Sequence, residues 1–281
     1  MSEGGTGSPT PARRRSGGRR WLDRASPILV VLGVLGLWEF GVRAGGVPAY
    51  LLPPPSSIVQ RIFADWRMLA GHTWVTTGEI LAGYVLAVVV SIPLAALLAR
   101  FRPLENALYP LLVASQTVPK VAIAPLLVVW FGFGVLPKVL IVFLICFFPI
   151  VVDALIGFRS VPREVLWLSR SMGASQWKTF RKISIPAALP NIFAGLKVAS
   201  TLAVVGAVVG EFVAADRGLG YQLIVANGVM DVQLSFALLI VLSVLGVVLH
   251  ALLDLLERAA LPWHVSQRVG AGVHGPAEGT A

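Results

Sequence analysis

Charged side chains within apolar stretches are the residues of this sequence best placed to do chemistry. A charge held in hydrocarbon is costly, so such residues typically line a path for ions or solutes, or pair with one another. Asp153 is expected either to face a cation in such a path or to pair with Lys120 or Lys197. Lys197 also lies near enough to a helix start to anchor at the membrane interface. The full set is Glu39, Glu79, Lys120, Asp153, Lys197, Glu211 and Asp254.

Catalytic and cofactor motifs are absent from the sequence. His72, His250, His264 and His274 form no H-E-x-x-H motif, and the lone Cys146 provides neither a disulfide framework nor a cysteine metal site. No G-x-x-x-x-G-K-[ST] loop occurs to hold nucleotide phosphates. We therefore expect no catalytic residue, no metal and no cofactor, and an enzyme within the membrane is only a remote alternative. If ATP drives this protein, another chain must bind it.

The elements that position these charges are membrane helices. The chain has 281 residues, of which 56% are hydrophobic and 13% charged, and its mean hydropathy is +0.80. A transmembrane helix needs about 20 mostly apolar residues, and several stretches here reach that length. The sequence therefore predicts an all-α integral membrane protein with six transmembrane helices, over 27–42, 76–99, 104–130, 136–158, 191–213 and 232–256.

The net charge of +9 is distributed as in a membrane protein. With the N-terminus inside, sixteen of the 23 Lys and Arg residues fall on the inner side and five on the outer side. The positive-inside rule then places both termini in the cytoplasm. Because the charges follow this asymmetry, no nucleic-acid partner is expected.

Composition also divides the chain into four parts. Residues 1–26 read as a disordered basic cytoplasmic tail, and 27–75 as the first span with an external loop. In that loop Ser57 and Gln60 have capping-box spacing, and Ile58, Ile62 and Phe63 predict a short amphipathic helix at the membrane interface. Residues 76–260 form the membrane core with a cytoplasmic loop at 159–190, and 261–281 form a cytoplasmic tail.

The third predicted span carries Pro119 and Pro125 in its interior. A proline removes a backbone donor, and in hydrocarbon such a break persists only where protein or a water-filled cavity satisfies the freed groups. Broken helices near the midplane often mark solute sites, which makes Asp153 and the polar run at the break candidates for a translocation path. A kink buried at a helix interface is an equal alternative. The candidates at the break are Ser115, Gln116, Thr117 and Lys120.

The longest cytoplasmic loop reads FRSVPREVLWLSRSMGASQWKTFRKISIPAALPNI. Glu164 falls in the first turn of a predicted helix that Gly173 ends, with a left-handed backbone at the glycine. A second helix begins near Ser175 and carries Trp177 and Ile183 on one side. Two short helices joined at a glycine form a protrusion that suits a partner's groove. The alternative is a solvated basic loop that serves only the charge asymmetry.

This loop resembles the EAA loop of ATP-binding cassette (ABC) importer permeases. Gly173, Ile183, Ile185 and Pro186 fall at the spacing of that motif. Trp167, Leu168 and Ser169 occupy its Glu-Ala-Ala positions, and Glu164, one turn earlier, is a candidate substitute for the glutamate. The resemblance implies an ATPase-coupling role for Glu164, Gly173, Ala174, Trp177, Ile183 and Pro186.

The resemblance extends from residue 76 to 256 and is strongest to permeases of the nitrate, sulfonate, taurine and thiamine-precursor group. VPKVAIAPLLVVWFGFG and GEFVAADRGLGYQL are its further markers. It implies a MetI-like type I importer permease in a bacterial inner membrane. The implied partners are two cytoplasmic ABC ATPase subunits, an extracytoplasmic substrate-binding protein and a second, identical permease subunit.

The substrate expected from the sequence is a small anion of the nitrate, sulfonate or taurine type, because Lys120 would leave the break weakly positive. A thiamine precursor or another small solute is the alternative. An ion-coupled secondary carrier is a further one, although the glycine-hinged loop and the lack of a second, inverted half disfavour it.

Overall fold

The computed structural model describes residues 18–262, with side chains from residue 29 onward. In this part of the chain every regular element is a helix. The order is α1 (Gly18–Ala44), α2 (Pro55–Ala64), α3 (Trp66–Arg100), α4 (Arg102–Gln116), α5 (Lys120–Phe131), α6 (Val135–Arg159), α7 (Arg163–Ser171), α8 (Gln176–Thr179), a π-helical turn η1 (Phe180–Ser184), α9 (Ile185–Ala214), α10 (Leu219–Gly228) and α11 (Val232–Ala260). Most of the tails expected over 1–26 and 261–281 lies outside the described residues, and 18–26 belong to α1.

Four helices in the described part are long and apolar enough to cross a membrane. They are α3, α6, the continuous helix Gln176–Ala214, and α11. The pair α4 and α5 would make a fifth span if the two helices count as one. The first predicted span falls within α1, which does not meet the same test, so the count of six is not confirmed.

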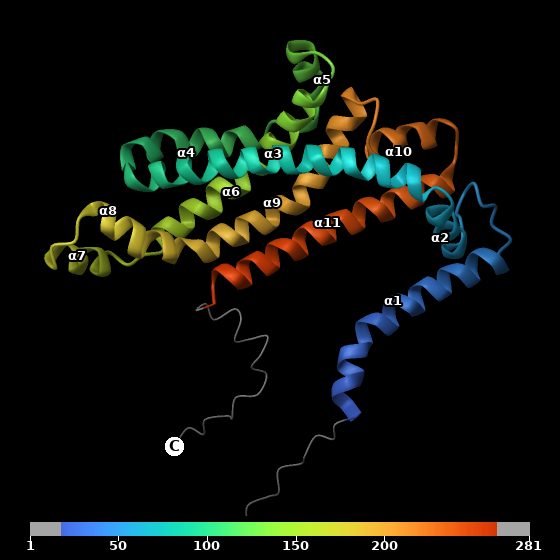
Figure 1. Ribbon diagram of the computed structural model, residues 1–281, viewed down its shortest axis with the longest axis horizontal. Coiled ribbons are helices and arrows are strands. Elements are labelled where there is room, and N and C mark those ends of the chain that lie inside the picture. Colours follow the sequence, from blue (N-terminus) through green and yellow to red (C-terminus); the bar gives the residue numbers. More distant parts are fainter. Residues whose placement is uncertain (1–17, 263–281) are drawn as a thin grey trace, which may run out of the picture.

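The core consists of α3, α6 and α9 packed side by side (Figure 1). Small residues let these backbones approach closely, as is common between membrane helices. A Cβ at Gly83 would lie 2.5 Å from Val142 Cβ, and one at Gly206 would lie 3.0 Å from Val142 Cα. The fully buried alanines at this packing are Ala87, Ala95, Ala154, Ala188, Ala199, Ala203 and Ala207.

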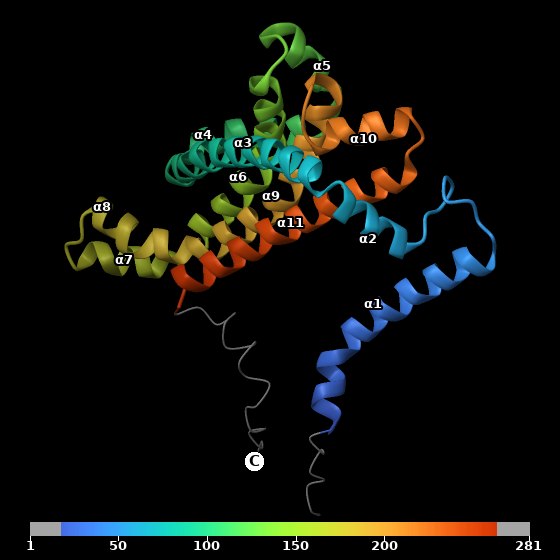
Figure 2. The same ribbon diagram turned by 45° about the vertical axis from the view of Figure 1, so that its right-hand side comes forward.

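Of the remaining helices, α11 runs alongside α9 and α4 alongside α3, and others lie at the two ends of the core (Figure 1). In both views α7 and α8 lie beyond one end of the bundle, and α10 lies toward the opposite end (Figures 1 and 2). α1 runs away from the bundle and meets it near its C-terminal end, where the Trp38 ring lies 5.7 Å from that of Phe236.

The amphipathic helix predicted in the external loop is present as α2, but its predicted cap is wrong. The helix begins at Pro55, and Ser57 Oγ donates to Pro54 O (2.8 Å) rather than accepting from the backbone. Pro55 is the first residue of α2 and has no backbone N–H, so no capping acceptor is needed for that group. Ile58 is buried, whereas Phe63 is 73% exposed.

Candidate functional site

The cytoplasmic loop has the helix–glycine–helix shape that its sequence predicts. Gly173 has φ +78°, and its N–H donates to Arg170 O (2.9 Å), while the Ala174 N–H donates to Ser169 O (3.0 Å). This pair of bonds is a Schellman motif, which satisfies carbonyls at the end of α7. Ser175 then caps α8 by accepting from the Lys178 N–H (3.3 Å). The chain thus reverses direction at a left-handed glycine.

Large apolar side chains lie exposed along this turn. Trp167 is 62% exposed, Leu168 61%, Met172 78% and Trp177 67%. Trp177 was identified from the sequence, whereas Met172 was not, because a methionine beside a glycine gives no periodic signal. Exposed apolar groups gathered at one tip typically mark a protein contact or a membrane contact.

Buried polar and aromatic contacts hold the two loop helices in place. Ser169 Oγ lies 3.1 Å from Thr179 Oγ1, which joins α7 to α8. The Phe180 ring stacks on Phe158 of α6 at 5.7 Å and lies 6.0 Å from Trp177. The loop is therefore fixed to the end of a membrane helix.

The second loop helix is continuous with the fifth predicted span, which the sequence did not predict. α8, η1 and α9 form one helix of 39 residues, Gln176–Ala214. Pro186 lies in the first turn of α9 and has no N–H to donate, and the π turn with half-buried Ile183 directly precedes it. A displacement of the loop tip would thus move the membrane segment with it. Glu164 is exposed in the first turn of α7 and forms no ion pair with a described residue.

The break in the third predicted span is a sharp bend. α4 and α5 meet at 95°, with the turn at residues 117–119. Pro119 has φ −63° and ψ 102°, and a proline also disfavours helix at the residue before it. The break expected within the span over 104–130 thus separates two helices, α4 and α5, which together make one span only if the bent pair is counted as one.

The polar residues at this bend are brought together and left open. Ser115, Gln116 and Thr117 are exposed, and Lys120 is half-buried as the first residue of α5. The two hydroxyls bond locally, Ser115 Oγ to Leu112 O (2.7 Å) and Thr117 Oγ1 to Ala114 O (2.8 Å). Among the side chains described, in residues 29–262, no carboxylate forms an ion pair with Lys120.

Asp153 has a different environment from the one expected. Lys197 pairs with Asp254 and Glu257 of α11, so the proposed pairing of Asp153 with Lys197 is wrong. Asp153 is half-buried on α6 against α9, where a Cβ at Gly195 would lie 2.7 Å from Asp153 Cβ. The lysine therefore joins α9 to α11, and the described residues show no ion pair for Asp153.

A buried ion pair near the opposite end of the core was missed by sequence reasoning. Lys138 Nζ pairs with Glu79 Oε1, and both side chains are at most 4% exposed. Lys138 is one of the five Lys and Arg residues that the charge count places on the outer side, because it lies near the start of an apolar run. Glu79 was recognised as an intramembrane charge, and its unassigned partner was the signal that a nearby lysine had to be buried.

A second carboxylate beside this pair holds the start of α10. Glu211 accepts from Thr76 Oγ1 (2.6 Å) and from the Gly220 N–H, and Leu219 N–H donates to Thr76 Oγ1 (2.8 Å). His72 Nδ1 accepts from the Gly218 N–H (3.0 Å). The first N–H groups of a helix lack intrahelical partners, and these side chains satisfy them. The network connects α3, α9 and α10.

These features together define a helical membrane protein with an exposed helix–glycine–helix loop at one end of its core. The chain matches the family described as "Binding-protein-dependent transport system inner membrane component" over residues 87–261, and it belongs to this family.

Relatives of known description agree with this family. The riboflavin transport system permease protein RibX of Chloroflexus aurantiacus is 39% identical over 88% of this chain and 92% of its own length. The formylaminopyrimidine transport permease protein ThiX of Halalkalibacterium halodurans is 38% identical over 89% of this chain and its full length. The taurine transport system permease protein TauC of Escherichia coli is 29% identical over 82% of this chain and 86% of its own length.

The fold also matches a solved structure, the methionine ABC transporter MetNI in an inward-facing conformation. The TM-score is 0.60 at 20% identity, covering 70% of this chain and 97% of the other. The protein is therefore a permease subunit of an ABC importer in the inner membrane, which moves a small solute. It is a transport subunit without catalytic activity of its own, and its partners include an ATPase and a substrate-binding protein.

Proposed function

We propose that the loop from α7 to α8 docks an ATPase subunit and transmits its movement to the membrane helices. The observation that carries this proposal is the exposed apolar tip formed by Trp167, Leu168, Met172 and Trp177 on a loop fixed to α6. Exposed Lys178, Arg181 and Lys182 flank the tip. Aromatic and Met side chains surrounded by polar ones are typical of the centre of a protein interface.

The continuous helix Gln176–Ala214 supplies a mechanism for coupling. A nucleotide that closes the ATPase dimer would draw two docked loops together, and each loop would move α9 as one body. The free energy by which the nucleotide shifts the transporter toward one of its two states equals the difference in nucleotide-binding free energy between those states. We infer an assembly of two copies of this chain with two ATPases and an external binding protein.

Site-specific crosslinking tests the docking. Trp177→Cys should crosslink to the ATPase in the assembled complex, whereas Trp74→Cys, on an 81% exposed side chain of α3, serves as the control and should not. Equal crosslinking at both positions, or none at Trp177→Cys in a transport-active complex, would contradict the proposal.

We infer that α1 also crosses the membrane, which gives six crossings with both termini in the cytoplasm. Its apolar side chains are unusually exposed, with Leu37 at 73% and Phe40 at 71%, as expected for a surface that faces lipid. The excess of Lys and Arg on the loop side supports the same orientation.

We propose that the solute is a small heterocyclic compound of the vitamin or vitamin-precursor kind. The support comes from the two relatives at 38–39% identity, whose names state riboflavin and formylaminopyrimidine. An anion such as a sulfonate is the second candidate, because Lys120 at the bend has no carboxylate partner among residues 29–262 and the taurine relative is 29% identical.

The residues that we place on the solute path are Ser115, Gln116, Thr117, Lys120 and Asp153. Their support is the exposed bend between α4 and α5 and the carboxylate of Asp153 without an ion-pair partner in the described chain. Identifying the ligand held by the binding protein encoded beside this chain separates the two solutes. An aromatic heterocycle supports the first, and a sulfonate or nitrate supports the second.

A further inference from the structure

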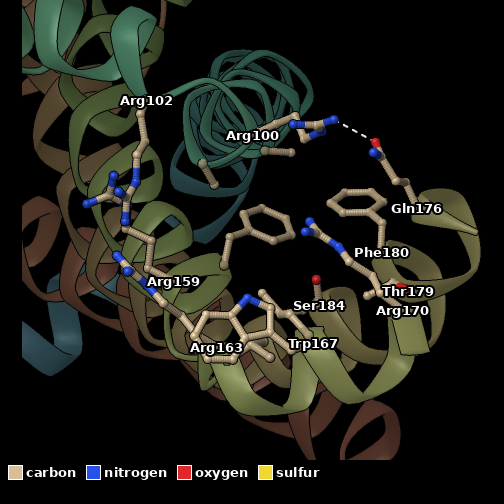
Figure 3. A pocket seen from close by; sticks show the side chains of 15 residues that line it. Arg100, Arg102, Arg159, Arg163, Trp167, Arg170, Gln176, Thr179, Phe180 and Ser184 are labelled. Atoms are coloured by element: carbon tan, nitrogen blue, oxygen red, sulfur yellow. Dashed lines mark hydrogen bonds between the residues drawn. The ribbon is translucent and has the colours of Figure 1, made fainter. Parts of the chain in front are cut away.

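A basic cavity lies between the membrane helices and the cytoplasmic loop. Its volume is about 660 Å³, within the range of small-molecule sites. The ends of α3 and α6 and the start of α4 line it together with α7, α8 and η1 (Figure 3). Five arginines line it, namely Arg100, Arg102, Arg159, Arg163 and Arg170.

The positive charge of this cavity is largely uncompensated. Arg159 pairs with Glu105, and Arg100 Nη2 donates to Gln176 Oε1 at 2.6 Å, which satisfies one donor without neutralising the charge. Arg102, Arg163 and Arg170 form no ion pair with any carboxylate in residues 29–262. Like charges gathered in one cavity repel one another, so the arrangement favours a bound anion.

The chemistry of the arginines indicates a phosphate. A guanidinium presents donors in a planar fork that matches phosphate oxygens two at a time, which a lysine ammonium cannot do. In Figure 3 the side chains of Arg102 and Arg159 stand on one side of the cavity and that of Arg170 on the other, so guanidinium groups line it from two sides.

The position of the cavity indicates a lipid as the source of that phosphate. α3 ends at Arg100, α4 begins at Arg102 and α6 ends at Arg159, so these three side chains lie at the level of lipid headgroups. Phe101 is 49% exposed and Leu97 45%, which provides apolar surface for an acyl chain beside the arginines. Basic pockets between membrane helices on the cytoplasmic side are suited to anionic headgroups.

We propose that this cavity binds the phosphate of an anionic phospholipid from the cytoplasmic leaflet. The leaflet follows from the orientation proposed above, but binding itself does not require it. Of the four tip residues only Trp167 also lines the cavity, and none of the five arginines belongs to the tip, so the lipid phosphate and the ATPase would contact different side chains.

Lipid retention by the purified full chain tests the proposal. Native mass spectrometry in a neutral detergent would compare phosphatidylglycerol with phosphatidylcholine for the wild type and for Arg102→Gln/Arg170→Gln. The matched control is Arg181→Gln/Arg217→Gln, which removes two exposed arginines outside the cavity and lowers the net charge equally. Melting temperatures in the same detergent verify folding, and Arg163→Gln alone provides a milder variant.

We expect the wild type and the control to retain phosphatidylglycerol in preference to phosphatidylcholine. The cavity variant should bind phosphatidylglycerol about tenfold more weakly, because two charge-assisted contacts are lost. Equal retention of the two lipids, or equal phosphatidylglycerol binding by the cavity variant and the control, would overturn the proposal.

Two further experiments distinguish a lipid phosphate from a soluble phosphate compound and from an acidic protein segment. Millimolar inorganic phosphate should not displace phosphatidylglycerol, because it lacks the acyl chains that contact Phe101 and Leu97; full displacement would assign the cavity to a soluble phosphate compound instead. A cavity variant that keeps its lipid but no longer copurifies with the ATPase would assign the arginines to an acidic segment of that partner.

Discussion

The buried pair of Glu79 and Lys138 allows a quantitative prediction. Both side chains are at most 4% exposed, and neither Glu79 oxygen accepts a hydrogen bond of ordinary geometry from a described residue. The lysine is therefore the group that compensates this carboxylate. Replacing Lys138 by Met keeps an unbranched side chain that is one atom shorter and removes its charge, which leaves Glu79 buried without a partner.

Breaking a buried ion pair from one side typically costs about 3–5 kcal/mol. At about 2–4 °C for each kcal/mol, this corresponds to a fall in melting temperature of about 6–20 °C. Replacing both partners, as in Glu79→Gln/Lys138→Met, leaves no unpaired buried charge and should restore most of the lost melting temperature. Thermal unfolding of Lys138→Met, Glu79→Gln and the double variant in one detergent, each purified as the full chain, measures these differences.

Comparing the single and double variants tests whether Glu79 and Lys138 compensate each other's buried charge. If Lys138→Met alone were as stable as the wild type, the pair would not compensate a buried charge. If the double variant were destabilised by the sum of the two single effects, the residues would act independently, and the coupling assigned to them would be refuted.

Three other predictions follow from the loop and the bend. Gly173→Val should destabilise the turn by about 1–2 kcal/mol and reduce copurification with the ATPase, whereas Gly173→Asn, which tolerates a positive φ, should be milder; normal transport by the valine variant would contradict the hinge. A cysteine at Ser175 should resist an impermeant thiol reagent added to intact cells, and labelling from outside would refute the orientation. Lys120→Gln should slow uptake in proteoliposomes while the complex still assembles, and unchanged uptake would assign this lysine to structure.

Local chemistry in the sequence predicted some of the features that depend on neighbouring residues, although the cap expected at Ser57 was wrong. Gly173 ends α7 in a left-handed conformation, and Ser175 caps α8, because both features need only a few adjacent residues. The proline break after Thr117 was also recognisable, since Pro119 removes a donor wherever it falls. The 95° angle between α4 and α5 could not be recognised from the sequence, because it depends on how α5 packs against α6 and α9.

Features that depend on contacts between distant segments could not be read from the sequence. Glu79 lies on α3 and Lys138 on α6, and neither sequence segment indicates that the two residues pair. Lys197 illustrates the same difficulty, since its partners Asp254 and Glu257 lie on the last helix. A buried charge indicates that a partner exists, but only the packing of the helices identifies that partner.

The continuity of α8, η1 and α9 was also missed, for a local reason. Pro186 and Pro190 suggest a helix boundary between the loop and the span, and proline at the start of a helix is common. The π turn directly before Pro186 lets the helix continue through the proline.

Solute uptake into proteoliposomes tests the central claim most directly. The permease would be reconstituted with its ATPase, and the binding protein loaded with its ligand would be supplied on the outer side. As an ABC importer subunit, the protein should transport only when ATP, the ATPase and the binding protein are all present, with no dependence on a proton or sodium gradient. Uptake by the permease alone, driven by an ion gradient without ATP, would contradict the account and identify a secondary carrier.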